Sequence, residues 1–271
     1  MDTSHSSVIT LTTDFGTNDP YIGVMKGVIL NINPHIHIVD ITHSIPPQNI
    51  HDAAFIIDSA YRYFPSGSIH VVVVDPGVGS TRRAIACQTE TGCFVCPDNG
   101  VLSYVLDEDA PYRAVSVDNT EYCLPEISNT FHGRDIFAPI AAHLSRGIPL
   151  GDIGGTVNNL VRLNSSKAQV TKTEIIGRII WIDSFGNLIS NISSEIFEST
   201  IARENFAIRV GNAEINRLNG SYAESQAGEC LAIIGSFGQL EISVNQGNAA
   251  QRLELKRGDP IVVRKTEKIR H

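Results

Sequence analysis

The sequence has little of what marks several classes of protein. No apolar run approaches the ~18 residues that a membrane span needs. Residues 1–7 have neither the basic nor the apolar segment of a secretory signal. The formal net charge of −8 provides no basic face for a nucleic-acid backbone. We therefore expect a soluble, cytoplasmic protein with no membrane partner and no nucleic-acid partner.

Cysteine is scarce as well. The five cysteines are an odd number, which without a secretory signal argues against a disulfide framework. Cys93 and Cys96 have the CxxC spacing of metal and redox sites, but no second pair follows them. They lie in a predicted strand, where side chains alternate between the two faces. Buried thiols are therefore favoured over a redox pair, and no metal site is expected.

One stretch stands out in an otherwise ordinary composition. Residues 71–74 are four consecutive valines, a pattern that predicts a strand buried on both faces. The run ends abruptly at Asp75, and Gly77, Gly79 and Arg82 follow. A buried strand has no need of a charge at its tip, whereas an open parallel sheet binds ligands beyond the carboxyl ends of its strands. Asp75 and the loop after it are therefore the first candidate site.

The N-terminal part alternates predicted strands with predicted helices. Strands are expected over residues 8–12, 36–41 and 69–74, with amphipathic helices over 21–32 and 49–63. Right-handed crossovers between such strands produce a parallel sheet with helices on both faces. Three polar loops then meet at one edge of that sheet, and they comprise residues 14–19, 42–44 and 75–82.

The rest of the chain falls into two parts. Up to about residue 150 we expect a hairpin, a short helix, a strand and a longer helix, over 84–95, 101–106, 112–117 and 136–145. Beyond it, short alternating segments punctuated by turn residues are typical of a small antiparallel β domain. The predicted fold is α/β: a domain over residues 1–160 with a mostly parallel sheet flanked by helices, and a smaller, antiparallel β-barrel-like domain over 170–271.

The residues alone leave the roles of the polar candidates open. Arg82 follows Asp75 by seven positions, which suits a structural ion pair. It equally suits a pair in which Arg82 keeps Asp75 ionised and the two orient a water molecule. His132 directly precedes a predicted helix, with Arg134 and Asp135 after it, so a cap and a catalytic group are both open. His43 lies at the same predicted edge.

Six short motifs occur in order along nearly the whole chain. They are LTTDFG at 11–16, DPYIGVMKG at 19–27, DPGVG at 75–79, PDNG at 97–100, FHGRD at 131–135 and IDSFGN at 182–187. One such motif is weak, whereas six in register are specific. In these motifs the chain resembles the adenosine-forming S-adenosyl-L-methionine (SAM) hydrolases, also called SAM hydroxide adenosyltransferases, which are related to the fluorinase and chlorinase.

The resemblance implies an architecture and a catalytic set. The family has an α/β domain and a β-barrel domain, and it forms a homotrimer with active sites at the subunit interfaces. Its catalytic aspartate, arginine and histidine fall on Asp75, Arg82 and His132. Arg83 is adjacent to Arg82, and the seven-residue spacing favours Arg82. The small-molecule partner is SAM itself, as substrate, with no further cofactor and no metal.

The resemblance also implies a set of substrate-binding positions. Asp14 matches the carboxylate that holds the ribose hydroxyls, while Asp183 and Asn187 match groups at the methionine end of the substrate. The implied substrate-binding residues are Asp14, Phe15, Asp19, Tyr21, Phe131, Asp183, Phe185, Asn187 and Ser236.

The departures from the halogenases favour hydrolysis. In the halogenases a tyrosine takes the place of Asp75 and a serine that of Gly133, and arginines stand at the positions of Phe237 and Val244. The expected reaction is hydrolysis of SAM to adenosine and L-methionine by attack of water or hydroxide at the ribose C5′. Two alternatives stay open: a halogenase of the same fold that forms a 5′-halo-adenosine, and a non-catalytic module that binds adenosine or SAM.

Overall fold

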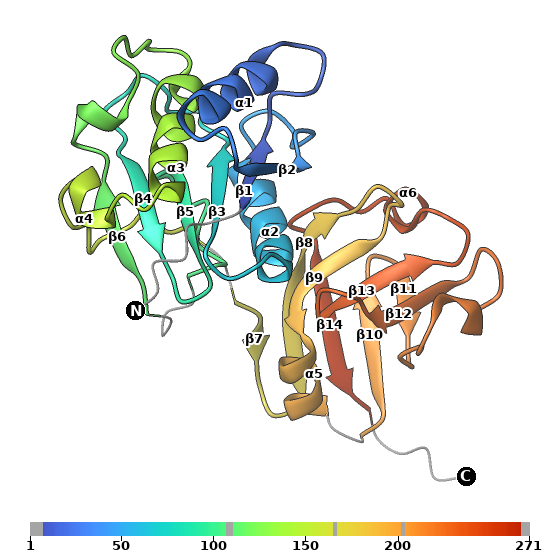
Figure 1. Cartoon of the computed structure of the whole chain (residues 1–271). Coiled ribbons are helices and arrows are strands. Elements are labelled where there is room, and N and C mark those ends of the chain that lie inside the picture. Colours follow the sequence, from blue (N-terminus) through green and yellow to red (C-terminus); the bar gives the residue numbers. More distant parts are fainter. Residues whose placement is uncertain (1–7, 107–110, 165–166, 202–203, 267–271) are drawn as a thin grey trace, which may run out of the picture. The chain divides into compact units, whose positions relative to one another are not determined.

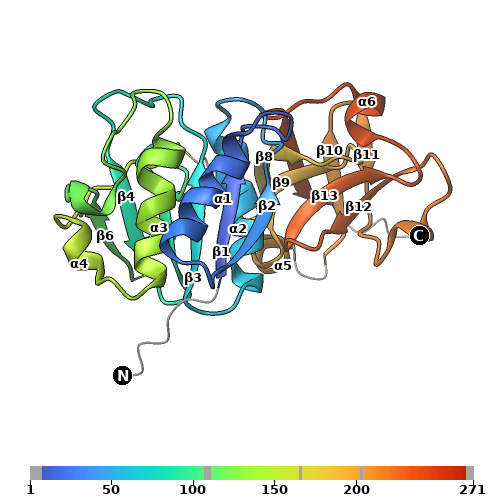
Figure 2. The same cartoon turned by 45° about the horizontal axis from the view of Figure 1, so that its top comes forward.

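The computed structural model describes residues 8–106, 111–164, 167–201 and 204–266 of the 271. The chain divides into two compact units, residues 1–165 and 166–271. Unit 1 is α/β, and unit 2 is mainly antiparallel β (Figures 1 and 2). None of the described helices is both long and apolar enough to cross a membrane.

Unit 1 is built on a six-stranded sheet with the order β2-β1-β3-β5-β4-β6. The pairs β1–β2, β1–β3 and β3–β5 are parallel, whereas β4 runs antiparallel to both of its neighbours. The prediction of a mostly parallel sheet is therefore confirmed. The strands are β1 (Val8–Thr13), β2 (His37–Thr42), β3 (Ser68–Val73), β4 (Ala84–Gln88), β5 (Gly92–Pro97) and β6 (Arg113–Ser116).

Helices cover both faces of this sheet because its central strand is apolar on both sides. Val71 and Val73 of β3 belong to one core cluster, which includes residues of α1 (Tyr21–Ile32) and α3 (Ala138–Ser145). Val72 and Val74 belong to a second cluster, with residues of α2 (Ile50–Ala60). The run of four valines is thus the boundary between two cores, as expected for a strand buried on both faces.

The segment 101–106 forms turns, so the predicted helix there is wrong. Gly100 precedes it in the left-handed region, with φ +96°, and the Ser103 hydroxyl donates back to the Gly100 carbonyl at 2.6 Å. In so short a segment the few backbone hydrogen bonds do not offset the free-energy cost of helix nucleation. A hydrogen bond from a side chain to a nearby carbonyl also competes with the backbone bonds of a helix.

The helix predicted over 136–145 begins earlier, with a π-helical turn, η3 (Gly133–Phe137), that continues as α3. This entry is tightly packed: a Cβ on Gly133 would lie 3.2 Å from Met25 Sδ and 3.2 Å from the Phe131 ring. A glycine therefore lets the chain enter α3 directly beside α1. The remaining short helices of unit 1 are η1 (Tyr61–Tyr63), η2 (Thr120–Tyr122) and α4 (Leu150–Ile153).

Unit 2 is a nearly closed, barrel-like antiparallel sheet, which confirms the predicted fold of this region. Its order is β11-β10-β14-β8-β9-β13-β12, with β7 paired to β8, and the end strands β11 and β12 contact each other. The strands are β7 (Gln169–Val170), β8 (Glu174–Ile182), β9 (Leu188–Ser193), β10 (Phe206–Val210), β11 (Ala213–Ile215), β12 (Cys230–Ile234), β13 (Gln239–Val244) and β14 (Pro260–Lys265).

Three short helices of unit 2 were not predicted from the sequence. They are α5 (Ser194–Ile201), η4 (Tyr222–Glu224) and α6 (Ala249–Leu253). Phe197 and Ile201 of α5 and Ala249 of α6 are buried in the barrel core. Helices this short hold their shape through such tertiary packing, which local sequence patterns do not report.

Candidate active site

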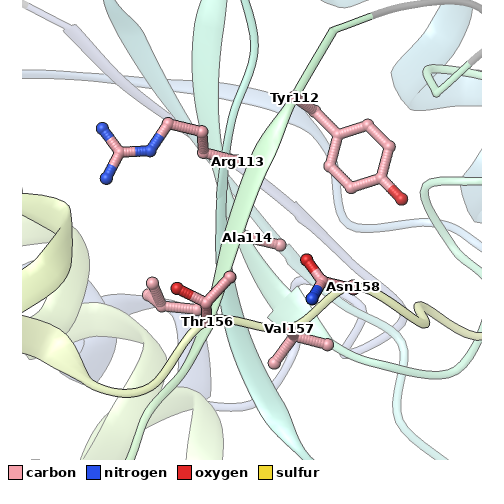
Figure 3. A pocket seen from close by; sticks show the side chains of 7 residues that line it. Tyr112, Arg113, Ala114, Thr156, Val157 and Asn158 are labelled. Atoms are coloured by element: carbon pink, nitrogen blue, oxygen red, sulfur yellow. The ribbon is translucent and has the colours of Figure 1, made fainter.

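A pocket of about 190 Å³ lies along the edge strand β6 (Figure 3). It is lined by Tyr112, Arg113, Ala114, Val115, Thr156, Val157 and Asn158. No residue of the predicted catalytic or substrate-binding sets is among them. Asp14, His43 and Asp75 lie instead in the loops at the carboxyl ends of the parallel strands β1, β2 and β3.

Two of the three predicted loops are joined directly to each other. Thr13 Oγ1 lies 2.9 Å from His43 Nδ1, and the Gly16 amide donates to the His43 carbonyl at 2.8 Å. The Asp14 carboxylate accepts from the backbone amide of Gln48 at 2.7 Å. The ends of β1 and β2 therefore meet, and His43 is a buried link between their loops.

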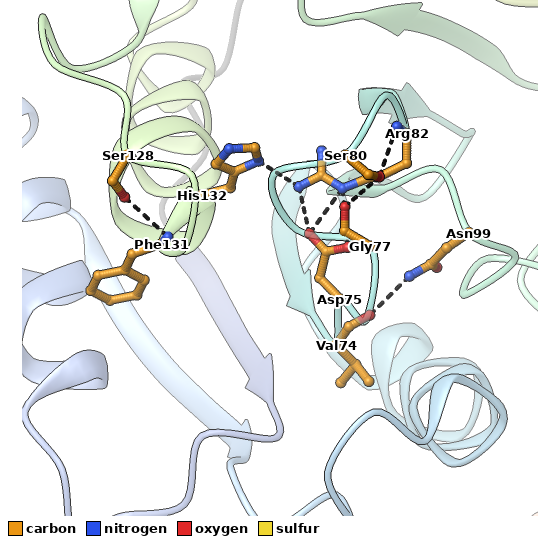
Figure 4. Close-up of polar contacts among 9 residues, drawn as sticks. All are labelled: Val74, Asp75, Gly77, Ser80, Arg82, Asn99, Ser128, Phe131 and His132. Carbon is orange, nitrogen blue, oxygen red and sulfur yellow. Dashed lines mark hydrogen bonds and ion pairs between the residues drawn. The ribbon is translucent and has the colours of Figure 1, made fainter.

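The third loop places Asp75 and Arg82 face to face (Figure 4). Arg82 Nε donates to both carboxylate oxygens of Asp75, at 3.0 and 2.9 Å, and Nη2 reaches Oδ2 at 2.5 Å. The same Nη2 lies 2.6 Å from His132 Nδ1. Both members of the ion pair are almost fully buried, with side-chain exposures of 10% for Arg82 and 5% for Asp75. The structure thus brings together all three residues of the predicted catalytic set.

The contact with Arg82 defines the state of the His132 ring. A guanidinium can only donate, so Nδ1 accepts, and the proton of the neutral ring is on Nε2. Burial, and then the positive charge of Arg82, lower the pKa of His132 below its ordinary value, against smaller opposing effects that include the charge of Asp75. At neutral pH the cluster therefore holds an Asp–Arg ion pair beside a neutral imidazole.

Arg83, the adjacent candidate for the catalytic arginine, contacts Asp98 and Asn159 and not Asp75. Its Nη2 donates to Asp98 Oδ2 at 2.5 Å and to the Asn159 carbonyl at 2.7 Å. Asp98 also accepts the Val161 amide at 2.8 Å. Arg83 therefore ties a later segment of unit 1 to the β4–β5 hairpin, and Arg82 alone of the two contacts Asp75.

The loop between Asp75 and Arg82 is shaped by its glycines and one serine. The Ser80 hydroxyl donates to the Gly77 carbonyl at 2.6 Å and accepts the Arg82 amide at 3.2 Å. Gly79 has φ +75°, and a Cβ there would lie 2.3 Å from the Asn129 carbonyl oxygen. Only glycine meets both requirements. The loop is thus pressed against the turn that carries His132.

Three aromatic side chains of the predicted substrate-binding set form a cluster in unit 1. The ring centroids of Phe15 and Phe131 are 5.9 Å apart, and Tyr21 lies 5.8 Å from Phe15 and 5.1 Å from Phe131. Tyr21 is 46% exposed, and Asp19, two residues before it, is exposed as well. The cluster offers an apolar surface for a planar or apolar group of a ligand.

The predicted residues of unit 2 lie at two exposed turns. Asp183 accepts the amides of Phe185 and Asn187, each at 2.9 Å, and the Asn187 side chain donates to its second oxygen, also at 2.9 Å. This turn leaves Phe185 75% exposed. Ser236, exposed between β12 and β13, lies in the second turn.

The five cysteines are free thiols, and three of them, Cys87, Cys93 and Cys96, are buried, as predicted for Cys93 and Cys96. Burial raises the pKa of Cys93 to about 12 and the pKa of Cys96 well above its usual value. Among the residues that the structure describes, no group of three or more histidine, cysteine or acidic side chains is arranged to hold a metal ion.

The sequence did not reveal two further residues beside the cluster. Asp135 is fully buried and accepts from both Ser128 and Arg134. Asp135 lies within the FHGRD motif, and its position before a predicted helix left both a cap and a catalytic group open. Ser128 carried no signal, since its role depends on a turn that closes in space.

Comparisons with known proteins identify relatives of this chain. The family model described as the SAM hydroxide adenosyltransferase N-terminal domain matches residues 9–154, and the C-terminal domain model matches residues 177–262. A protein of Salinispora tropica named (R)-S-adenosyl-L-methionine hydrolase is 36% identical, over 94% of this chain and 97% of that protein. Its namesake from Methanocaldococcus jannaschii is 37% identical, over 94% and 95%.

The chain is also similar to a more distant group of enzymes and to a solved structure. A fluorinase of an Actinoplanes species is 27% identical, over 98% of this chain and all of that protein. The crystal structure of an uncharacterized conserved protein from Thermotoga maritima superposes with a TM-score of 0.88 at 38% identity, over 95% of this chain and all of that one. With both domain models matched in order across most of its length, the chain belongs to the SAM hydroxide adenosyltransferase family.

Proposed function

We propose that this protein hydrolyses SAM to adenosine and L-methionine, with water or hydroxide attacking the ribose C5′. The observation that carries the proposal is the buried cluster in which Arg82 bridges the carboxylate of Asp75 and the neutral ring of His132. Its support from comparison is the pair of relatives named SAM hydrolase, which align over most of their length.

The chemistry suits a cluster that handles a water molecule and not a metal or a cofactor. SAM is a sulfonium cation, so attack at C5′ expels neutral methionine and charge is dispersed or annihilated in the transition state. A dry site that strips water from the nucleophile accelerates such a step. Arg82 stabilises hydroxide character, Asp75 or His132 accepts the proton, and the three together align the nucleophile with the C5′–S bond. SAM is the substrate, and no further cofactor takes part.

The remaining predicted residues divide the substrate between them in this proposal. The Asp14 carboxylate binds the ribose hydroxyls, and the aromatic cluster of Phe15, Tyr21 and Phe131 packs beside the nucleoside. Asp183 and Asn187 bind the methionine end. The other members of the proposed substrate-binding set are Asp19, Phe185 and Ser236.

We also propose a cytoplasmic homotrimer whose active sites lie between subunits, as the family resemblance implies. One feature of the fold supports a surface that meets a partner. Phe185 is 75% exposed although it is large and apolar, and Phe237, in the second turn, is 45% exposed. Exposed aromatic side chains of this kind are typical of surfaces that meet a ligand or another chain.

The halogenase alternative has a specific observation against it. Fluorinase relatives are 25–27% identical, whereas the SAM hydrolase relatives are 34–37% identical. In the halogenases that the chain resembles, a tyrosine takes the place of Asp75. Here the Asp75 carboxylate is the counter-ion of Arg82, and a tyrosine would leave that buried guanidinium without a full negative charge.

Incubation of the protein with SAM in chloride-free buffer made with ¹⁸O-water, followed by mass spectrometry, tests the proposal. We expect methionine and adenosine that carries ¹⁸O at its 5′ oxygen. A 5′-halo-adenosine on addition of chloride or fluoride, in place of adenosine, would establish the halogenase. Intact SAM retained by the protein over hours would establish the binding module instead.

A further inference from the structure

A second buried carboxylate lies next to the proposed catalytic cluster without belonging to it. Asp135 has no exposed surface. Its Oδ2 accepts the backbone amide of Ser128 at 2.9 Å and the Ser128 hydroxyl at 2.7 Å. Arg134 closes the group, with Nε 2.5 Å from Oδ1 and Nη2 3.1 Å from Oδ2. Ser128 and Arg134, the hydrogen-bond partners of this carboxylate, both belong to the segment that carries His132.

Ser128 also connects the Asp135 carboxylate to Phe131, the residue before His132. Its hydroxyl oxygen accepts the amide of Phe131 at 3.1 Å (Figure 4). The hydroxyl proton is donated to Asp135. The Asp135 amide in turn donates to the Phe131 carbonyl at 3.1 Å. The segment 128–135 is thus closed into a loop of hydrogen bonds around one carboxylate.

The loop orients two side chains to different sides. Figure 4 shows His132 pointing to Arg82 and Phe131 pointing away from it. The Phe131 ring belongs to the aromatic cluster, and the Arg134 guanidinium carbon lies over that ring, 5.2 Å from its centroid. A rotation of this turn would therefore move the proposed catalytic ring and the proposed substrate surface together.

The charge on Asp135 is suited to this task. Burial alone would raise the pKa of Asp135, but hydrogen bonds from Arg134 and Ser128 outweigh it and lower the pKa below its usual value. The carboxylate therefore stays ionised and keeps all of its donors. The backbone of Ser128 raises the pKa of His132 slightly, against the larger lowering effects of burial and Arg82.

We propose that Asp135, acting through Ser128, is a positioning residue that holds His132 in one orientation and one tautomer against Arg82, and Phe131 in the aromatic cluster. The inference rests on the proposed hydrolysis of SAM for its consequence in catalysis. Its structural content, the state of the His132 ring, does not depend on turnover.

A purely structural reading is that Asp135 and Ser128 only cap the start of a helix. A cap contributes about 1 kcal/mol to stability and leaves the chemistry alone. The two readings therefore differ in what they say about His132 and about kcat, and not in what they say about thermal stability.

The test compares Ser128→Ala with Ser116→Ala. Ser116 also donates its hydroxyl to an aspartate, Asp118 at 2.5 Å, but it lies on β6, three strands from β3. Ring-¹⁵N histidine NMR of the full-length protein reports the tautomer, with the His132 signals assigned by their loss in His132→Asn. We expect the Nε2–H tautomer in the wild type and in Ser116→Ala, and a mixture of tautomers in Ser128→Ala.

Turnover of SAM adds the catalytic consequence. In Ser128→Ala, and more strongly in Asp135→Asn, we expect kcat to fall by about 10- to 100-fold, the range that a small misplacement of a catalytic group produces. Ser128→Thr, which keeps the hydroxyl, restores the tautomer and most of kcat. Ser116→Ala keeps the wild-type kcat.

A wild-type tautomer and kcat in folded Ser128→Ala would overturn the inference. Should Asp135→Asn not fold, the Ser128 variants decide the question alone. A wild-type protein without SAM turnover would overturn the proposed function, whereas the NMR comparison would still decide whether Ser128 sets the state of His132.

Discussion

At the scale of single residues, Arg82 is the centre of the candidate active site. Its guanidinium offers five donors in a rigid plane, and here they connect a carboxylate to an imidazole. The pair with Asp75 is almost fully buried, so removing one partner leaves a charge unpaired at a cost of about 3–5 kcal/mol. The same burial removes bulk water from the place where we propose that a single water reacts.

The proposed roles of Asp75 and His132 predict that variants at these positions lose kcat and keep their affinity for SAM. In Asp75→Asn and His132→Ala we expect kcat for SAM hydrolysis to fall about 10²- to 10⁴-fold, the range for loss of general acid–base catalysis. Affinity for SAM changes little, because neither group holds the substrate in the proposal. Steady-state kinetics with calorimetric binding measure both, and unchanged turnover in either variant would contradict the assignment.

The two adjacent arginines provide a matched pair of variants. In Arg82→Lys we expect kcat to fall about 100-fold, because a lysine cannot bridge Asp75 and His132 with the geometry of a guanidinium. In Arg83→Lys, which breaks contacts to Asp98 and Asn159, we expect a lower melting temperature with a near wild-type kcat. Equal losses of kcat in both variants would show that the second arginine also acts in turnover.

His70 predicts a pH dependence of stability that has nothing to do with catalysis. It is buried on β3 with Nδ1 2.8 Å from Thr10 Oγ1, and burial lowers the pKa of His70 to about 4. The unfolded chain, with an ordinary pKa near 6.5, therefore binds the proton first as the pH falls. The stability that neutral His70 contributes is complete above about pH 6.5 and is lost progressively towards pH 4.

Between pH 7 and pH 5 this one residue lowers the free energy of unfolding by about 2 kcal/mol. Urea unfolding at the two pH values measures the loss. His70→Gln, which does not titrate in this range, is less stable at pH 7 but lacks this part of the slope. An equal slope in wild type and variant would mean that His70 is not neutralised by burial.

At the scale of elements, the candidate site depends on loops that follow parallel strands. β1, β2 and β3 all end at the same edge, so polar loops far apart in the sequence come within hydrogen-bonding distance. The β3 loop is further constrained by Asn99, whose side chain donates to the Val74 carbonyl at 2.9 Å. The π-helical start of α3 then brings the FHGRD motif to that loop from another direction.

Gly79 is the point at which the β3 loop and the His132 turn touch, and two glycine variants can isolate it. Gly79→Ala combines backbone strain at φ +75° with a clash against the Asn129 carbonyl. Gly67→Ala has the same strain at φ +84° but open space around it, far from the strand ends that carry the site. Both variants are expected to lose about 1–2 kcal/mol of stability from strain.

Only Gly79→Ala is expected to lower kcat as well, by about tenfold or more, because the loop must move away from the turn. Unfolding free energies and SAM turnover of the two variants provide the comparison. A similar kcat in both would indicate that the contact between loop and turn has no part in the reaction.

At the scale of the whole molecule, each unit has its own hydrophobic core and its own share of the predicted residues. The catalytic set and the aromatic cluster are in unit 1, whereas Asp183, Asn187 and Ser236 are in unit 2. We propose residues 1–160 and 170–271 as the domains. The first would carry the chemistry, and the second would bind the methionine end.

The proposed homotrimer predicts a mass in solution. Three chains of 29.4 kDa amount to about 88 kDa, which light scattering after size exclusion measures directly. We expect this mass over a wide range of protein concentrations. In Phe185→Ala, which removes an exposed aromatic side chain, we expect a higher KM for SAM and an unchanged melting temperature. A mass near 29 kDa would contradict the trimer and the interface sites together.

Local pattern was sufficient for much of this protein. Runs such as the four valines at 71–74 mark a doubly buried strand, and the helical period over 21–32 matches α1 residue for residue. Because parallel crossovers send every strand end to one edge, the sequence by itself determined where the polar loops would gather. The motif resemblance added the names of the catalytic candidates.

Tertiary structure decided which of those candidates touch. Arg82 and His132 are 50 positions apart, and the seven-residue spacing could favour Arg82 over Arg83 but not exclude its neighbour. The choice depends on the path of a loop whose turn at Gly79 is set by a distant carbonyl. The sequence left the polar cluster at 132–135 open between a cap and a catalytic group, because hydrogen-bond partners are selected by geometry in the folded chain. Periodicity reports which residues are buried but not which residues they contact.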